Sequence, residues 1–372
     1  MPSRSVSVLL CLGMIICCCA PLTICEESDS EIILVHAIFR HGERTPSRSY
    51  PTDPYKNETF YPIGLGGLTN NGKLMMFKLG EILRYMYGGL LGDVYNDGIV
   101  YVRSRYVPRT QMSALLVLAG MWPPNVDQKW HPSLNWQPIP VQYERAEHEQ
   151  LLDPVCKNLQ GELNAYYEKP EIEEKYIRPY REFFNFIENH TGLKINDFRD
   201  ISRFYFTLKT EEDNGLILPE WTRSIYPEPL HKFAAFHYAY KNLEKKYRVI
   251  NSGFLVKQIL KDSLAKVDGT LKPANRKIFL YSAHETTLGY LLFNLRVFPM
   301  EVPDYGNAIL VELHKRHGEY FLKIRYLRTP LAPTVEELTI PDCKTLCPIE
   351  RFEELQRASD FLPGDTFHED CY

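Results

Sequence analysis

Residues 32–46 read IILVHAIFRHGERTP, and this stretch decides the fold. Its first eight residues are apolar apart from one histidine, as expected of a strand buried on both faces. The polar residues that follow offer Arg40 and Arg44 with His41 between them. Arginine suits phosphate because its planar fork donates two parallel hydrogen bonds and stays charged at any relevant pH. An imidazole between two fixed positive charges resists protonation, so its nitrogen stays available as a nucleophile below neutral pH.

A basic surface loop that pairs with nearby carboxylates is the plainer interpretation of an isolated Arg-His-Gly, because short motifs occur by chance. The longer pattern Arg-His-Gly-x-Arg-x-Pro at a strand end is more specific. Two further junctions match it. Residues 277–283 form a strand candidate that ends in His284 and Glu285, and residues 99–104 lead to Arg109 at the start of a helical run. In an open α/β sheet, ligands bind outside the carboxyl ends of the strands, so these side chains are expected to converge.

Hydrophobic periodicity outlines an α/β core from about residues 31–120 and 254–327. Apolar residues recur at helical spacing over residues 70–87, and they alternate on both sides of a His-Gly turn in residues 308–313 and 320–326. The first pattern predicts an amphipathic helix and the second an antiparallel hairpin. Because strand-like and helix-like segments alternate, the expected fold is α/β, with a mixed, largely parallel sheet flanked by helices.

Residues from about 123 to 230 lack this alternation. They are rich in proline, tryptophan, tyrosine and glutamate, and helical stretches are expected near residues 170–188 and 197–210. We interpret the segment as a helical cap inserted over the sheet.

The first 25 residues are interpreted as a secretory signal peptide. Residues 8–20 form a continuous run of apolar residues and cysteines, which is too short to span a bilayer and has the length of a signal-peptide core. A cut after Ala20 would leave proline at the new terminus, so cleavage near Cys25 is favoured. An N-terminal membrane anchor is the alternative, and the length of the run argues against it. Past residue 283 no uncharged run reaches the roughly 18 residues of a membrane span, so no anchor is expected there.

Cysteine usage agrees with export. Five of the nine cysteines lie in the first 25 residues, and the others are Cys156, Cys343, Cys347 and Cys371. An even number in an exported chain suggests two disulfides, and four cysteines allow three connectivities. Zinc is a weaker interpretation of the Cys343-x-x-x-Cys347 spacing, because no second close pair or histidine cluster accompanies it. Asn57 and Asn189 begin glycosylation sequons, which are meaningful in an exported chain.

Charge and composition exclude several classes of function. The net charge of −4 gives no electrostatic case for binding nucleic acid. A metal-dependent phosphatase would need several carboxylates and histidines at the strand ends. This chain places arginines there, which repel cations, so neither a metal nor another cofactor is expected.

Together, the three junctions resemble the histidine acid phosphatase branch of the histidine phosphatase superfamily. The stretches that carry the resemblance are RHGERTP at 40–46, VYVRS at 100–104 with RTQMSA at 109–114, and YSAHETT at 281–287. The resemblance runs from about residue 31 to the C-terminus, and it implies one phosphatase domain over residues 26–372 with the cap as an insertion. Within the family, the chain is most similar to secreted acid phosphatases of insect venom, through GLGGLTN at 64–70 and LNWQP at 134–138.

The resemblance assigns a role to each strand-end residue. It makes His41 the nucleophile, which takes up the phosphoryl group as a phosphohistidine, and Glu285 the proton donor to the leaving alcohol. The phosphoryl oxygens would be held by Arg40, Arg44, Arg109 and His284. Such fixed cationic donors stabilise a transferring phosphoryl group without reorganising.

The chain departs from its prostatic and lysosomal relatives in two places. Glu285 stands where they have aspartate, which keeps the carboxyl and adds one methylene. Between Arg103 and Arg109 they place acidic residues, whereas this chain has RYVP at 105–108. The resemblance also implies a disulfide pairing of Cys343 with Cys347 and of Cys156 with Cys371.

The sequence therefore predicts a secreted acid phosphatase that hydrolyses phosphomonoesters without a metal. A phytase-like preference for inositol phosphates is one alternative, but it would favour a strongly cationic pocket rim, and the mixed charge of the cap gives little sign of one. A non-catalytic venom or binding protein on the same fold is another, and the chemical competence of all six site positions argues against it. The sequence leaves the oligomeric state open, a homodimer included, and indicates no nucleic-acid or membrane partner.

Overall fold

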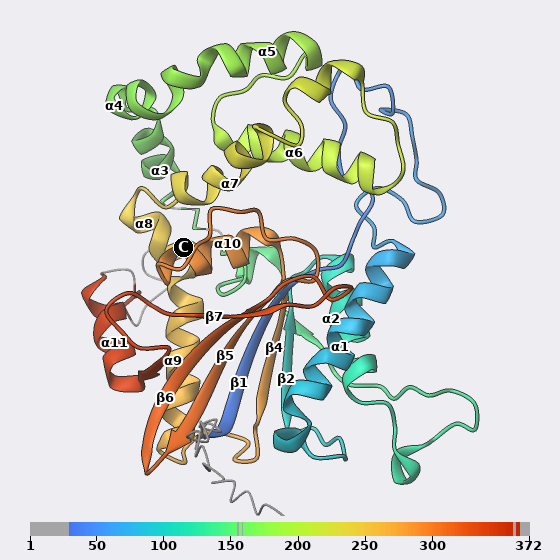
Figure 1. Ribbon diagram of the computed structural model, residues 1–372, viewed down its shortest axis with the longest axis vertical. Coiled ribbons are helices and arrows are strands. Elements are labelled where there is room, and N and C mark those ends of the chain that lie inside the picture. The colour runs from blue at the N-terminus through green and yellow to red at the C-terminus, as the bar shows by residue number, and fades with distance from the viewer. Residues whose placement is uncertain (1–29, 155, 158, 360–361, 365–372) are drawn as a thin grey trace, which may run out of the picture.

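Two layers make up the molecule, an α/β layer built on one sheet and a helical layer that covers one end of it (Figure 1). The structure is a computed structural model and describes residues 30–359 and 362–364, except residues 155 and 158. The expected signal peptide, residues 1–25, and Cys371 lie outside the described residues.

One sheet of eight strands runs in the order β3-β2-β4-β1-β5-β6-β7, with β8 beside β6. The strands are β1 (Glu31–Arg40), β2 (Val100–Ser104), β3 (Gln142–Tyr143), β4 (Ile278–Ala283), β5 (Ala308–Arg316), β6 (Glu319–Leu327), β7 (Val335–Leu338) and β8 (Leu346–Pro348). The pairs from β3 to β1 are parallel, and those from β1 to β7 and β8 are antiparallel. The expected mixed sheet and the hairpin of β5 and β6 are thereby confirmed.

Strand β1 lies in the middle of the sheet because both of its faces are apolar. Val35, Ala37 and Phe39 pack on one side, against the helices α1 (Asn70–Leu91) and α2 (Pro108–Met121). Leu34 and Ile38 pack on the other side. That side is covered by α9 (Phe254–Val267), α10 (Glu285–Asn294) and α11 (Ile349–Ala358). The alternation follows from the two-residue period of a strand.

The helical layer contains α3 (Gln160–Tyr167), α4 (Pro170–Ile172), η3 (Glu173–Ile177), η4 (Arg178–Tyr180), α5 (Arg181–Thr191), α6 (Phe198–Asp213), η5 (Glu220–Ser224) and α7 (Leu230–Tyr240). It has its own aromatic core, in which Phe184, Phe198 and Phe204 are almost fully buried. The short helices α8 (Lys245–Arg248) and η6 (Val249–Gly253) lead from it to α9. The loop after β1 also reaches this layer, since the backbone N–H of Thr52 donates to the Thr191 carbonyl oxygen at 3.3 Å.

The helical layer differs in extent from the expected cap of residues 123–230. Its helices run from residue 160 to residue 240, whereas the segment before them follows the edge of the sheet. That segment contains η1 (Val126–Gln128), strand β3 and η2 (Ala146–His148). Gln142 and Tyr143 extend the sheet because the edge of β2 offers unpaired backbone groups. A strand of two residues has no periodic pattern, so the sequence does not predict it. The division of the chain into a domain and an insertion stays a prediction.

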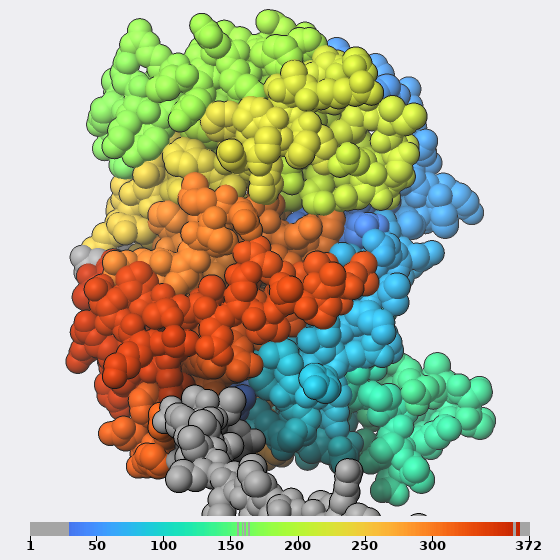
Figure 2. All heavy atoms as spheres, in the orientation of Figure 1, coloured from blue at the N-terminus to red at the C-terminus, as the bar shows by residue number. Residues whose placement is uncertain are grey.

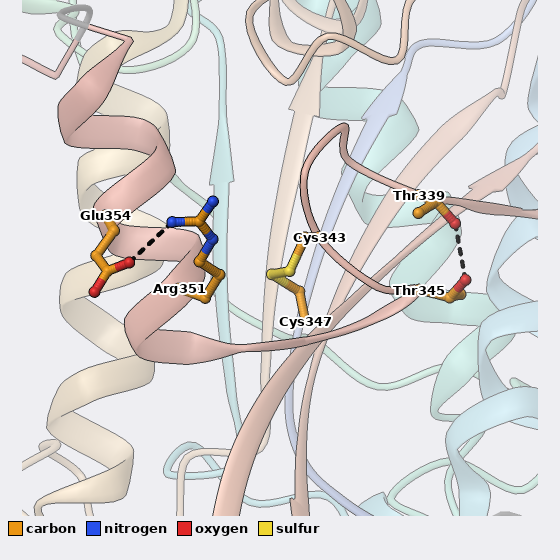
Figure 3. The surroundings of a disulfide bond; sticks show 6 residues. All are labelled: Thr339, Cys343, Thr345, Cys347, Arg351 and Glu354. Carbon is orange, nitrogen blue, oxygen red and sulfur yellow. Dashed lines mark hydrogen bonds and ion pairs between the residues drawn. A yellow bond between two sulfur atoms is a disulfide. The ribbon is translucent and has the colours of Figure 1, made fainter.

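The expected disulfide between Cys343 and Cys347 is present, with the two Cα atoms 5.6 Å apart (Figure 3). It closes a short loop before β8, beside a 2.8 Å hydrogen bond between the hydroxyls of Thr339 and Thr345. Cys156 is disulfide-bonded. Its pairing with Cys371 stays a prediction, which peptide mapping without reduction would test.

Both sequon asparagines, Asn57 and Asn189, are exposed, as glycosylation requires, and the modification itself stays a prediction. Within the described part of the chain, no helix combines the length and the apolar character needed to cross a membrane.

Candidate active site

The carboxyl ends of β1, β4 and β2 lie level with one another, and this brings the three sequence junctions together. In the parallel register Arg40 is opposite Ala283, and Ser104 is opposite Ser282. The residues that follow these strand ends therefore enter one space, as the alternation of strands and helices predicts. Figure 2 shows a recess there, between the helical layer and the sheet layer, with blue atoms from the early part of the chain visible inside it.

His41 is fully buried at the centre of this space. Its Nδ1 lies 2.8 Å from the carbonyl oxygen of Gly42 and donates to it, which leaves Nε2 without a proton. Nε2 accepts a hydrogen bond from Nε of Arg109 at 3.0 Å. Burial, followed by the charges of Arg109 and Arg40, holds the pKa of His41 well below its usual range. The imidazole is therefore neutral, and the lone pair of Nε2 faces the site.

Arg40 is fully buried and offers two donor groups to the site that make no hydrogen bond among the described residues. Its Nη1 donates to the carbonyl oxygen of Pro303 at 2.8 Å, and its guanidinium lies 4.0 Å from the ring centre of Tyr305. Its Nε and Nη2 are buried and have no hydrogen-bond partner among the described residues. Because an unmet buried donor is costly, these groups are arranged to receive an anion.

Arg44 and Arg109 are the other two arginines of the site. Nη1 of Arg44 donates to the carbonyl oxygen of Thr45 at 2.9 Å, which anchors one side of its guanidinium. Burial and then the charge of Arg44 lower the pKa of Arg109 to about 10, so Arg109 remains protonated at neutral pH. Three arginines thus meet at one point, an arrangement that favours a multiply charged anion such as phosphate.

His284 and Glu285 approach from β4. The ring of His284 lies edge-on to that of His41, with 5.3 Å between centres. Burial and the charge of Arg109 lower its pKa to about 3, so it is neutral. Burial alone would raise the pKa of Glu285, but Arg40, His284 and Arg44 outweigh it and lower the pKa to about 2. An ionised carboxylate therefore stands 3.6 Å from Nε of Arg40.

The loop that carries His41 is held by the start of α1. Thr69 is the N-cap of this helix, and its hydroxyl also donates to Oε1 of Glu43 at 2.7 Å. Gly42 and Gly72 allow the two backbones to touch, since a Cβ at Gly42 would lie 2.3 Å from the carbonyl oxygen of Gly72. Glycine is thus required here for close approach, and the contact fixes His41 in place.

Arg109 is positioned by the start of α2. The hydroxyl of Ser282 donates to the carbonyl oxygen of Thr110 at 2.7 Å, which ties the end of β4 to this helix. The hydroxyl of Thr110 in turn donates to the carbonyl oxygen of Arg105 at 2.9 Å. These buried bonds hold the start of α2 in place, and from there the Arg109 side chain reaches His41.

Several residues of the site carry no signal in the sequence. Tyr305 and Asp304 come from the loop before β5, and Oδ1 of Asp304 lies 3.9 Å from Nη1 of Arg40. Phe206 of α6 covers the same guanidinium at 5.0 Å. The position of β5 antiparallel to β1 brings that loop to the site, and the hairpin pattern alone did not reveal which strand β5 joins. Arg105, in the segment expected to differ from the prostatic and lysosomal enzymes, is buried and contacts Asp153 at 2.5 Å.

One group of ligating side chains in the described residues is close enough for a metal ion. The ligand atoms of His41, His284 and Glu285 lie within 4.8 Å of one another. Arg40 and Arg109 lower the pKa values of both histidines, so they disfavour added positive charge at the same place. The electrostatics of the group therefore suit an anion better than a cation.

Residues 31–327 match the histidine phosphatase superfamily (branch 2). The chain belongs to this family. The venom acid phosphatase of Apis mellifera is 36% identical over 342 residues, which cover 91% of this chain and 87% of that protein. The human prostatic acid phosphatase is 35% identical, with 87% of this chain and 84% of the relative covered.

Solved structures show the same fold. A phytase from Klebsiella superposes with a TM-score of 0.65 at 14% identity, over 90% of this chain and 98% of that one. A phytase from Citrobacter braakii superposes with a TM-score of 0.63 at 19% identity, over 88% of this chain and 98% of that one.

Proposed function

We propose that this protein is a secreted acid phosphatase that hydrolyses phosphomonoesters through a phosphohistidine at His41. The observation that carries the proposal is the unprotonated Nε2 of a buried His41, bonded to Arg109 at 3.0 Å. A nucleophile needs a free lone pair, and phosphoryl transfer needs fixed cationic donors around it. The membership in the histidine phosphatase superfamily supports the same chemistry.

In the first step, Nε2 of His41 bonds to phosphorus as the bond from phosphorus to the ester oxygen breaks. Arg40, Arg44, Arg109 and His284 bind the phosphoryl oxygens, and Arg109 exchanges its bond to Nε2 for one to the substrate. In the second step, a water oxygen bonds to phosphorus and the N–P bond breaks. This releases phosphate and restores the neutral imidazole.

Glu285 supplies the proton to the leaving alcohol in this proposal. Its pKa is about 2 in the free site because burial is outweighed by Arg40, His284 and Arg44. A phosphate anion bound to those arginines offsets their charge, so the carboxyl takes up a proton when the substrate binds. In the second step the same carboxylate accepts a proton from the attacking water.

Two further parts of the proposal concern metal and location. We propose that no metal takes part, because three arginines face the only ligand group found among the described residues. We propose export because a short apolar run begins the chain and because named relatives include venom and prostatic enzymes. A phosphomonoester is the partner, and neither nucleic acid nor membrane is involved.

The test is an assay of the purified protein on nitrophenyl phosphate across the range of about pH 4 to 8, where general acid–base groups are resolved. Activity that survives dialysis against a strong chelator is expected, and loss restored by zinc or magnesium would exclude the metal-free mechanism. Rapid quenching without acid, followed by peptide mass spectrometry, should find a phosphoryl group on His41. A protein without turnover would instead favour a non-catalytic role on the same fold.

A further inference from the structure

The buried charge of Arg40 is held by two aromatic rings, one from each layer of the molecule. The ring centre of Tyr305, in the loop before β5, lies 4.0 Å from the guanidinium carbon, and that of Phe206, on α6, lies 5.0 Å from it. The carboxylate oxygens of Glu285 and Asp304 come no closer to the guanidinium nitrogens than 3.6 and 3.9 Å. The cation is therefore surrounded by aromatic faces more closely than by carboxylates.

Aromatic faces stabilise a cation in a way that suits a binding site. The ring attracts the charge through its quadrupole, and this attraction is strongest where water is excluded, as it is around the fully buried Arg40. A carboxylate would use the N–H donors of the guanidinium, whereas a ring accepts no conventional hydrogen bond. Nη1 is bonded to the carbonyl oxygen of Pro303, and Nε and Nη2 have no hydrogen-bond partner among the described residues. The rings thus fix the guanidinium and leave two of its donors available to a ligand.

Helix α6 supports both rings. Lys209 follows Phe206 by three residues, so the two side chains lie on the same face of the helix. Nζ of Lys209 lies 5.2 Å from the ring centre of Tyr305, and 3.7 Å from Oδ1 of the neighbouring Asp304. Helix α6 therefore contacts Arg40 directly through one ring, and it also holds the loop that supplies the other.

The other two arginines of the site are held differently. Within the described part of the chain, neither Arg44 nor Arg109 lies over an aromatic ring, and the cation–π contacts of the site are those of Arg40. Arg44 is anchored by the carbonyl oxygen of Thr45, and Arg109 by Nε2 of His41. An effect of the Phe206 ring should consequently depend on Arg40 alone.

We propose that Phe206 is a positioning residue of the phosphatase reaction. Together with Tyr305 it holds Arg40 so that Nε and Nη2 meet the oxygens of the transferred phosphoryl group. The helical layer then takes part in binding the reacting group itself, through α6. This inference rests on the proposed phosphatase activity, in which Arg40 binds the phosphoryl oxygens.

The test measures inhibition constants, because these do not depend on the fraction of the protein that is folded. Phe206→Leu removes the ring and keeps an apolar side chain. The inhibition constant of orthovanadate, which resembles the transition state, should rise about tenfold, as expected for the loss of a buried cation–π contact. The constant for inorganic phosphate should rise less, and kcat/KM should fall in proportion to the vanadate effect.

Phe204→Leu is the matched control on the same helix. Phe204 is buried and packs against Tyr50 and Trp221, with ring centres 5.6 and 6.1 Å away. Its replacement should lower the unfolding temperature and leave both inhibition constants unchanged.

A double-mutant cycle shows whether Phe206 acts through Arg40. Arg40→Gln removes the guanidinium, so Phe206→Leu should add little to the loss of kcat/KM that Arg40→Gln causes. The losses from Phe206→Leu and Arg44→Gln should instead add, because Arg44 does not contact the ring. Tyr305→Leu should resemble Phe206→Leu, and Tyr305→Phe, which keeps the ring, should lose less.

Three results would overturn the inference. These are an unchanged vanadate constant in Phe206→Leu, an equal rise in Phe204→Leu, and losses that add for Phe206→Leu and Arg40→Gln. If Phe206→Leu does not fold, Phe206→Met takes its place in the same cycle.

Native protein without turnover would be titrated with orthovanadate in a calorimeter. Binding that Phe206→Leu weakens would support the positioning role although the phosphatase proposal had failed. Absence of vanadate binding by the native protein would overturn the inference.

Discussion

The catalytic edge of the sheet holds a partly buried glutamate and the helical layer holds a buried one, and the two behave in opposite ways. At the sheet edge, Arg40, His284 and Arg44 outweigh the effect of burial and lower the pKa of Glu285 to about 2. In the helical layer, Glu211 is 1% exposed, and burial followed by the charge of Asp53 raises its pKa to about 8. The first carboxyl is ionised at neutral pH, and the second keeps its proton.

Burial disfavours the ionised form of both carboxyls, and nearby cations reverse its effect only at Glu285. The strand ends concentrate cations, which stabilise anions. Burial, followed by the charge of Arg109, keeps His41 and His284 neutral. The contact between α6 and the loop after β1 instead joins two acidic side chains, Glu211 and Asp53, away from any cation that offsets them. The sheet edge is arranged for chemistry on an anion. The contact between Glu211 and Asp53 is structural, and it stabilises the fold more in acid than at neutral pH.

The largest expected effect is at His41. His41→Ala removes the only proposed nucleophile, so turnover should fall by at least about 10³-fold, as when a covalent nucleophile is removed elsewhere. Steady-state kinetics on nitrophenyl phosphate measure it, and thermal unfolding shows whether the variant is folded. A variant that keeps a tenth of the native activity would mean that the sheet edge binds phosphate without forming a phosphohistidine.

Glu285 should matter in proportion to how badly the alcohol leaves. Glu285→Gln keeps the shape but cannot donate the proton as an acid, and such transfer contributes about 10²–10⁴-fold. The loss should be large on an alkyl phosphate and small on nitrophenyl phosphate, whose leaving group needs no proton. Pre-steady-state formation of the phosphoenzyme is the measurement, because either step can limit turnover. Equal losses on both substrates would show that Glu285 only shapes the site.

Glu211 should make the protein more stable in acid. Its ordinary pKa of 4.5 rises to about 8 in the folded state. The folded state therefore holds a proton that the unfolded chain loses between these values, so this contribution to stability is complete below about pH 4.5 and is lost as the pH rises to about 8. Roughly 2 kcal/mol or more of unfolding free energy should depend on pH in this window.

Denaturant unfolding of native protein and of Glu211→Gln across that window measures this effect. The amide stays neutral at every pH, so the variant should have a flatter pH profile. Glu182→Gln, exposed on α5 of the same layer, is the control. Profiles of equal slope for native protein and Glu211→Gln would show that Glu211 is already ionised and that the contrast with Glu285 does not hold.

The smallest expected effect concerns the bond that joins the two regions. Asn214→Ala removes the hydrogen bond from Nδ2 to the carbonyl oxygen of Arg44, which should cost about 1 kcal/mol of stability. Because that bond holds the loop of Arg44, the KM for a phosphomonoester should rise a few-fold while kcat changes little. Asn185→Ala, exposed on α5, serves as the control. An unchanged KM would mean that the sheet edge holds Arg44 by itself.

The limits of sequence-based prediction can be seen at individual residues. The strands of the core, the helix after residue 70 and the terminal hairpin follow from hydrophobic periodicity, which depends only on near neighbours in the chain. Strand β3 was missed because two residues have no period. The helices of the helical layer begin at residue 160 rather than near residue 123, because proline and tryptophan near residue 123 are as typical of an edge segment as of a cap.

The sequence by itself determined the chemistry at the strand ends. His41 lies between Arg40 and Arg44, and Glu285 follows His284, because these neighbours are covalently linked and sit at the ends of buried strands. Only the tertiary structure decided that Nε of Arg109 bonds to Nε2 of His41, and that Glu211 of α6 meets Asp53 of the loop after β1. Those contacts join segments from tens to well over a hundred residues apart, and such pairings depend on how the layers pack rather than on any local pattern.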